Sequence, residues 1–200
     1  MKDSYSVKSI DSAEGKSFVK KYHYSHGSMR SASPCFGLFD ENNLIGCMLL
    51  STPASENVRS FIFGKQYKNH VKELHRLVLV DDTPKNTESW FISRCLKLCR
   101  ELRPDIWGLI SYSDLTEGHT GTIYRASNAI YSGMTNESTF YLDGDRLRHP
   151  RQCGINISKK EAISKGWIPV KRKSKHRFVF ILGNRSEKRF RYSKIRKEVF

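Results

Sequence analysis

The stretch from residue 74 to residue 112 constrains the fold more than any other part of the sequence. Residues 74–80 (LHRLVLV) and 106–112 (IWGLISY) are short apolar runs with the length and composition typical of strands. Between them, residues 88–102 repeat apolar side chains at helical spacing, and Pro104 ends that pattern. The members of this apolar stripe are Phe91, Ile92, Cys95, Leu98, Cys99 and Leu102. The order predicts two parallel strands joined by a right-handed helical crossover.

The flanking sequence extends this unit into a mixed α/β domain. The expected elements are a helix at 12–22, a hairpin of strands at 35–39 and 44–50, a helix at 120–131, and strands at 139–142 and 178–182. We expect Tyr131 to face the core from the helix at 120–131. The chain has 200 residues, of which 38% are hydrophobic, and this suits one compact domain with a buried core. We therefore predict an α/β (α+β) single domain in which helices flank a mixed central sheet.

Positive charge is concentrated in the C-terminal part of the chain. The net charge is +15; residues 159–200 contain 15 basic and 3 acidic residues, against 20 and 17 in residues 1–158. We divide the domain accordingly into a body, 1–158, and a basic C-terminal region. Such a charge suits a nucleic acid, or secondly an anionic membrane surface. Interleaved aromatic residues favour a folded nucleic-acid-binding surface over a solubilising tail, and these are Trp167, Phe178, Phe180, Phe190 and Tyr192.

The sequence also indicates where the protein acts. No segment approaches the roughly 20 apolar residues of a membrane span, and Asp3, Asp11 and Glu14 do not fit a signal peptide. The five cysteines include no C-x-x-C pair, and Cys95 and Cys99 are expected to face the core. We predict a soluble protein of the reducing cytoplasm.

The loop at 81–89 is the first candidate binding site, because it follows a strand and begins a helix. Lys85 and the helix N-terminus beyond Asn86 suit a phosphate or a carboxylate. Alternatively, Asn86, Thr87 and Ser89 serve only to cap the helix.

The second candidate site lies between residues 111 and 124, where polar residues are dense. Asp114 has the chemistry of a base or a metal ligand, and His119 that of an acid, base or ligand. Tyr124 is a hydroxyl donor at the start of a helix. Taken singly, Asp114 and Thr120 are equally explained as turn and capping residues, and Tyr124 as a core residue.

Two smaller groups complete the candidates. His23 and His26 are three residues apart, which suits a metal or simply a polar helix end. Glu73 and His75 share one face of their strand, and Arg76 takes the other, where it needs a partner if buried and is a candidate anion anchor.

Several blocks of residues, in order along residues 20–135, resemble the bacteriophage Mom family. They are His23-Tyr24-Ser25, Glu73-Leu74-His75-Arg76-Leu77, Pro84-Lys85-Asn86-Thr87-Glu88-Ser89, Ser111-Tyr112-Ser113-Asp114, Gly118-His119-Thr120-Gly121-Thr122-Ile123-Tyr124-Arg125-Ala126 and Tyr131-Ser132-Gly133. The resemblance implies a fold related to the GNAT acetyltransferases. It also implies a phage enzyme that converts adenine in duplex DNA to N6-carbamoylmethyladenine and so protects phage DNA from host restriction. The Gly-rich pyrophosphate loop of ordinary acetyltransferases is replaced here by Pro84-Lys85-Asn86-Thr87-Glu88-Ser89.

The resemblance further implies which residues form the site. The implied catalytic residues are His23, Tyr24, Arg76, Ser89, Asp114 and Tyr124, supported by Asn86 and His119. The implied cofactor-binding residues are Lys85, Asn86, Thr87 and Ser89, and iron, if used, would have His23 or Asp114 as a ligand. The implied DNA-binding residues are Lys171, Arg172, Lys173, Lys175 and Arg177.

The implied partner is double-stranded DNA, with the adenine flipped out and stacked on Tyr24 or Tyr112. The donor is acetyl-CoA or another activated, host-derived small molecule, and no membrane is involved. Asp114 or His23 is the expected proton acceptor, while Arg76 and Tyr124 orient the reacting groups. Two other functions remain open at this point: an N-acyltransferase that uses acetyl-CoA on a small-molecule or protein amine, and a non-enzymatic DNA-binding protein.

Overall fold

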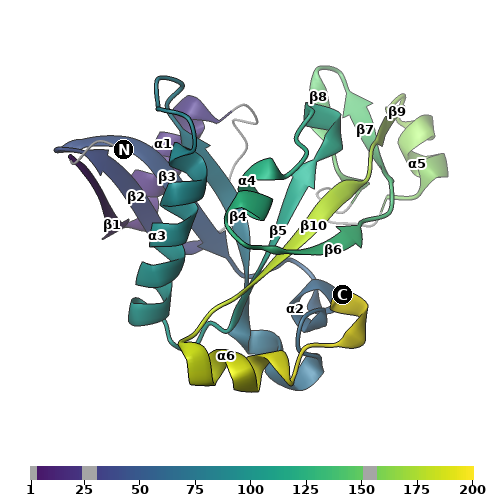
Figure 1. Ribbon diagram of the computed structural model, residues 1–200. Coiled ribbons are helices and arrows are strands. Elements are labelled where there is room, and N and C mark those ends of the chain that lie inside the picture. Colours follow the sequence, from purple (N-terminus) through teal and green to yellow (C-terminus); the bar gives the residue numbers. More distant parts are fainter. Residues whose placement is uncertain (1–3, 24–30, 151–156) are drawn as a thin grey trace. The chain divides into compact units, whose positions relative to one another are not determined.

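The computed structural model describes residues 4–23, 31–150 and 157–200, which form two compact units (Figure 1). The large unit comprises Met1–Tyr112, Gly121–Gly133 and Arg177–Phe200. The small unit comprises Ser113–Thr120 and Met134–His176. The basic C-terminal region is therefore shared, with residues 159–176 in the small unit and 177–200 in the large unit.

The large unit is built on a seven-stranded mixed sheet, which confirms the predicted fold class. The strand order is β1 (Tyr5–Ile10), β2 (Ala32–Asp40), β3 (Asn43–Ser51), β4 (Val71–Leu79), β5 (Gly108–Asp114), β10 (Lys175–Ile181) and β6 (Ile130–Met134). The first four strands pair antiparallel, whereas β4 and β5 pair parallel and are joined through α3 (Thr87–Leu102). The predicted strand-helix-strand unit is thus confirmed.

Helices cover both faces of this sheet. On one face, α3 buries Phe91, Ile92, Cys95 and Cys99 against a core that includes Phe178. Leu102, predicted in the same stripe, is 51% exposed because it is the last residue of the helix. The other face is covered by α1 (Ser12–Tyr22), by α2 (Glu56–Ser60) with η1 (Lys65–His70), and by the C-terminal η4 (Lys197–Val199).

One predicted helix is shorter than expected. The segment at 120–131 forms α4 (Thr122–Ala126), and β6 then begins at Ile130. The helix ends because Asn128 adopts φ +61, a conformation that asparagine tolerates and a continuing helix excludes. Tyr131 consequently lies on β6, where it is 38% exposed rather than buried.

The C-terminal aromatic residues also divide differently from the prediction. Phe178 and Phe180 lie in the core, because β10 is a central strand, and they do not form a nucleic-acid-facing surface. Phe190 and Tyr192 are exposed on α6 (Arg185–Tyr192), a helix that was not predicted from the sequence.

The small unit contains a three-stranded antiparallel sheet in the order β8 (Arg146–Arg148), β7 (Ser138–Asp143) and β9 (Ile168–Arg172). The helix α5 (Lys159–Ser164) begins with a capping box between Ser158 and Glu161. Its Ala162 packs with Tyr141 and the partly buried Trp167. The turn after β5 contributes the short helix η2 (Leu115–Glu117).

Candidate functional site

The pairing between β4 and β5 covers only part of either strand. It runs from Val71↔Gly108 to Leu74↔Ser111, while β4 continues to Leu79 alongside β3. At the last pair, the Ser111 hydroxyl is buried and has no hydrogen-bond partner among the described residues. The parallel ladder therefore ends on a buried polar group, next to the carboxyl-terminal half of β4.

The first turn of α3 lies beyond that end of β4. Asn86 is the N-cap residue with φ +70, and its side chain makes no capping hydrogen bond. Thr87 Oγ1 donates to Pro84 O at 2.6 Å, and Ser89 Oγ donates to Asn86 O at 3.1 Å. Thr87 is fully buried, so of the residues predicted to bind a cofactor, Lys85, Asn86 and Ser89 are the ones with exposed surface. An anion at this turn would meet backbone N–H groups that no described side chain caps.

The helix α4 packs beside this first turn. Ser127 Oγ lies 3.4 Å from Ser89 O and 2.7 Å from Ile123 O. Tyr124, one turn earlier, packs its ring against Phe178 with the centroids 5.2 Å apart. Ser89 and Tyr124 are thus brought to the same part of the large unit, although they are far apart in the sequence. The Tyr124 ring belongs to the core, as the plainer alternative proposed.

Polar side chains also gather on the other face of the sheet, along β4 and β5. His75 Nδ1 lies 3.4 Å from Glu73 Oε1. The prediction that Arg76 takes the opposite face is wrong, because the pairing with β3 shifts register here and Arg76 pairs with Leu49, on the α1 side of the sheet. Burial, with the nearby Glu73 charge, raises the pKa of Tyr112 to about 12. Arg76 Nη1 donates to His75 O at 2.8 Å. The grouping of Tyr112 with Glu73 was not predicted, because it depends on how β4 and β5 pair.

Arg177 lies on the same face and is engaged within the large unit. Its guanidinium lies 3.7 Å from the Phe61 ring centroid, and its Nε and Nη2 donate to Ser132 O at 3.1 and 2.9 Å. Burial lowers the pKa of this guanidinium. These contacts use two of the five guanidinium N–H donors and place the group against the Phe61 ring, within the large unit.

In the small unit, Asp114 is the centre of an ion-pair cluster. Its Oδ2 lies 2.8 Å from Lys175 Nζ and 3.0 Å from Arg172 Nη2, and Oδ1 accepts from the Thr116 N–H at 3.0 Å. Arg172 Nη2 also lies 2.8 Å from Glu117 Oε1. Burial opposes the charged carboxylate, yet the hydrogen bonds and charges of Lys175, Thr116 and Arg172 lower the pKa of Asp114 to about 2.

The ion-pair cluster affects the roles predicted for Asp114 as a base and for the basic residues as DNA contacts. A carboxylate with so low a pKa is a weak proton acceptor at neutral pH, so Asp114 suits the turn-forming alternative better than the role of base. Arg172 and Lys175, predicted to contact DNA, are paired with carboxylates here, whereas Lys171 and Lys173 are exposed. His119 contributes its backbone to the same turn: its N–H donates to Asp114 O at 3.1 Å, and its carbonyl accepts from Ser113 Oγ at 2.6 Å.

The described residues do not fit an iron site. Within 4–23, 31–150 and 157–200, no three His, Cys, Asp or Glu side chains are grouped so that they could hold a metal ion. The oxygens of Asp114 face two cationic side chains, which would repel a metal cation. His23 is a buried C-cap residue of α1, and its N–H donates to Val19 O at 2.9 Å. Tyr24 and His26 lie outside the described residues.

Replacing Asp114 by Asn should destabilise the protein. Because the folded-state pKa is about 2 and the ordinary value is 3.8, the charged carboxylate adds stability that is fully present above about pH 4 and is lost as the pH falls to about 2. The shift corresponds to about 2 kcal/mol at pH 7. Urea unfolding at pH 7 and between pH 4 and 2 measures this difference, which should shrink as the pH falls.

Asp145→Asn is the matched control, since Asp145 is exposed in the same unit and takes part in none of the ion pairs among the described residues. It should change the unfolding free energy by less than about 0.5 kcal/mol. Equal stability of Asp114→Asn and the unmodified protein at pH 7 would show that the cluster contributes nothing.

Comparison with known proteins identifies the relatives of this fold. The model of the Mom protein family matches residues 4–197. The chain belongs to this family. It is 28% identical over 194 residues to methylcarbamoylase Mom of Escherichia phage Mu, and the match covers 92% of this chain and 78% of the phage protein.

Solved structures place the Mom-family chain in the GNAT acetyltransferase fold. The ribosomal-protein-S5-alanine acetyltransferase of Vibrio fischeri is similar with a TM-score of 0.53 at 12% identity, covering 92% of this chain and 96% of the enzyme. The ribosomal-protein-S18-alanine N-acetyltransferase of Escherichia coli has a TM-score of 0.51 at 6% identity, covering 90% and 95%. In the part of the chain that the structure describes, no helix is both long and apolar enough to cross a membrane.

Proposed function

We propose that this protein is a phage DNA-modification enzyme that converts adenine in duplex DNA to N6-carbamoylmethyladenine and protects that DNA from restriction. The observation that carries the proposal is the family match over residues 4–197, together with a relative named methylcarbamoylase. The acetyltransferase fold supports it, because both reactions transfer a carbon group to a nitrogen nucleophile.

The reaction requires the exocyclic nitrogen of adenine to attack an activated donor of the carbamoylmethyl group. A carbon–nitrogen bond forms, the bond to the leaving group breaks, and the nitrogen loses a proton. Because that nitrogen lies within a base pair, the adenine must leave the stack. The donor binds beyond the last paired residues of β4 and β5, with its anionic part at the first turn of α3 near Lys85 and Ser89.

Three residues act on the donor and the adenine in this proposal. Tyr124, on α4 beside that turn, donates a hydrogen bond to the donor or to its leaving group. His23 is the proton acceptor, since the ion pairs of Asp114 suit it to hold the β5–η2 turn in place. Arg76, on β4, orients the donor as a cation.

The test is to express the protein in bacteria, digest the cellular DNA to nucleosides and analyse them by mass spectrometry. We expect 2′-deoxyadenosine with an N6-carbamoylmethyl group, and none in cells with an empty vector. Unmodified adenine in cells that contain folded protein would contradict the proposal. If acetyl-CoA also raised the melting temperature in that case, an N-acyltransferase acting on another amine would be the better assignment.

Variants for such work need to be point substitutions rather than truncations. Removing the basic C-terminal region would delete β10, whose Phe178 and Val179 are fully buried in the centre of the sheet. Loss of activity in a truncated protein would therefore report unfolding and not loss of DNA contacts.

A further inference from the structure

The helix α6 carries a stripe of exposed cations. Arg185, Lys188, Arg189 and Tyr192 are spaced i, i+3, i+4 and i+7, so they share one helix face, and all four are exposed. The opposite face holds Arg191, which is buried and donates from Nη1 to Leu182 O at 2.8 Å. One face of the helix thus anchors it, and the other presents positive charge to solvent.

The three cations of this stripe differ from Arg172 on β9 and Lys175 on β10 in having no ion-pair partner among the described residues. Arg172 and Lys175 are paired with Asp114 in the small unit. Among the described residues, by contrast, no carboxylate lies within ion-pair distance of Arg185, Lys188 or Arg189. The one acidic residue of α6, Glu187, caps the Asn184 N–H at 2.7 Å and lies 3.3 Å from Arg191.

Aromatic packing fixes α6 against the large unit. Phe190 meets the Trp107 ring edge-on with the centroids 5.8 Å apart, and Trp107 stacks on His70 at 4.0 Å. Lys194 Nζ lies 5.2 Å from the centroid of the Phe190 ring. Because the helix is held by these contacts, binding a ligand on its outer face requires little further ordering of the backbone.

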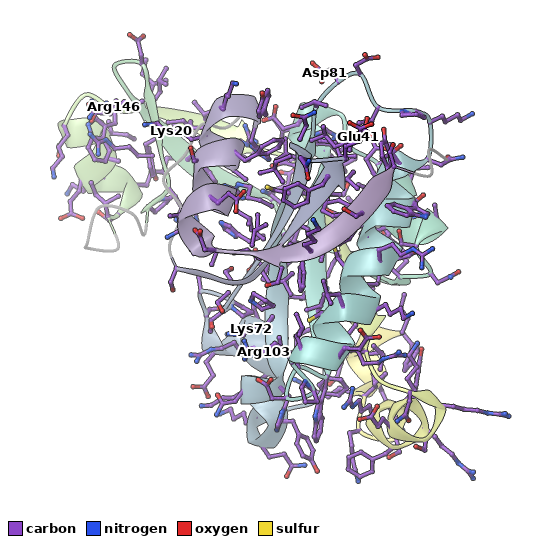
Figure 2. All side chains as sticks on the ribbon, turned by 90° about the vertical axis from the view of Figure 1, so that its left-hand side faces the viewer. Lys20, Glu41, Lys72, Asp81, Arg103 and Arg146 are labelled. Carbon is purple, nitrogen blue, oxygen red and sulfur yellow. The ribbon has the colours of Figure 1, made fainter. Side chains whose placement is uncertain are left out.

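The stripe lies at the end of the sheet opposite the first turn of α3. Leu182 N donates to Trp107 O at 2.9 Å, so β10 ends where β5 begins. Figure 2 shows Lys72 and Arg103 at this end of the large unit and Asp81, in the loop after β4, at the other. β4 has nine residues, which at about 3.3 Å each separates the two ends by about 25 Å.

We propose that the exposed face of α6 binds the sugar-phosphate backbone of duplex DNA at a distance from the modified adenine. This inference rests on the proposed function, which supplies duplex DNA as the substrate. Three unpaired cations and an aromatic ring on a rigid helix match a phosphate backbone. A membrane-surface helix would need a broad apolar face, and Tyr192, 45% exposed, is the one aromatic residue of the stripe.

The test compares the unmodified protein with a variant that carries R185A, K188A and R189A together. Fluorescence anisotropy measures the Kd for a labelled 20-base-pair duplex at several salt concentrations. Log affinity falls as log salt rises, and each lost phosphate contact makes this negative slope shallower by about 0.9. We therefore expect the steepness of the slope to decrease by about 2 to 3. Circular dichroism checks that the variant is folded.

The control variant carries K8A, K97A and K159A, which removes three exposed cations from β1, α3 and α5. It should leave the salt slope unchanged to within about 1, because these side chains lie outside the stripe. An unchanged slope in the α6 variant, or an equal decrease in the control, would overturn the inference. So would binding to phosphatidylserine vesicles that depends on α6 when duplex binding does not.

Failure of this inference is separable from failure of the proposed function. If the unmodified protein produces N6-carbamoylmethyladenine in cells but the α6 variant keeps the full salt slope, only the α6 surface is wrong. If duplex binding depends on α6 but no modified adenine forms, only the proposed chemistry is wrong.

Discussion

Replacing Gly121 by Ala is expected to lower the free energy of unfolding by about 3 kcal/mol and the melting temperature by about 10 °C. Gly121 has φ +78, a conformation that costs a residue with a Cβ about 1 kcal/mol or more. An added Cβ would also clash with Cε2 and Cζ of Phe178, which is fully buried and cannot move away without disturbing the core. Thermal and urea unfolding measure both quantities.

Gly133→Ala separates the cost of the backbone conformation from the cost of the clash with Phe178. Gly133 has φ +75 in the same unit, but nothing lies within 4 Å of an added Cβ. It should lose only the conformational part, about 1 kcal/mol. Equal losses in the two variants would show that Phe178 yields to the added methyl group, and would remove the packing part of the argument.

The fold was predictable where the signal is local. The apolar stripe of α3 and the two runs around it predicted the parallel pair β4 and β5, because helical and strand periodicities are properties of neighbouring residues. The central position of β10 was not predictable in this way, since the choice of a strand's neighbours depends on contacts between distant segments. Phe178 was therefore predicted on a nucleic-acid-facing surface, although it lies in the core.

The candidate site shows the same limit. Asp114 and Tyr124 were singled out by polar density, but the pairing of Asp114 with Arg172, 58 positions later, leaves no trace in local spacing. The helix α6 escaped detection because its buried face carries Arg191 instead of an apolar stripe. A local signal for it was the capping box formed by Asn184 and Glu187.

Tyr124→Phe is expected to lower the yield of N6-carbamoylmethyladenine by about 100-fold or more, with a change in unfolding free energy of about 1 kcal/mol or less. The substitution keeps the ring that packs on Phe178 and removes only the hydroxyl that the proposed chemistry uses. Mass spectrometry of DNA from cells that contain equal amounts of each protein measures the yield, and thermal unfolding measures the stability. A variant with full stability and low yield assigns the loss to the hydroxyl itself.

Tyr131→Phe is the matched control, because the Tyr131 ring also contacts Phe178, at 5.5 Å, but belongs to β6 and is partly exposed. Its yield should equal that of the unmodified protein. Tyr124→Phe with an undiminished yield would mean that the hydroxyl takes no part in the transfer, and that Tyr124 serves only to seat α4 on the core. In that case Ser89, whose backbone carbonyl lies 3.4 Å from Ser127 Oγ of the segment after α4, is the next hydroxyl to test.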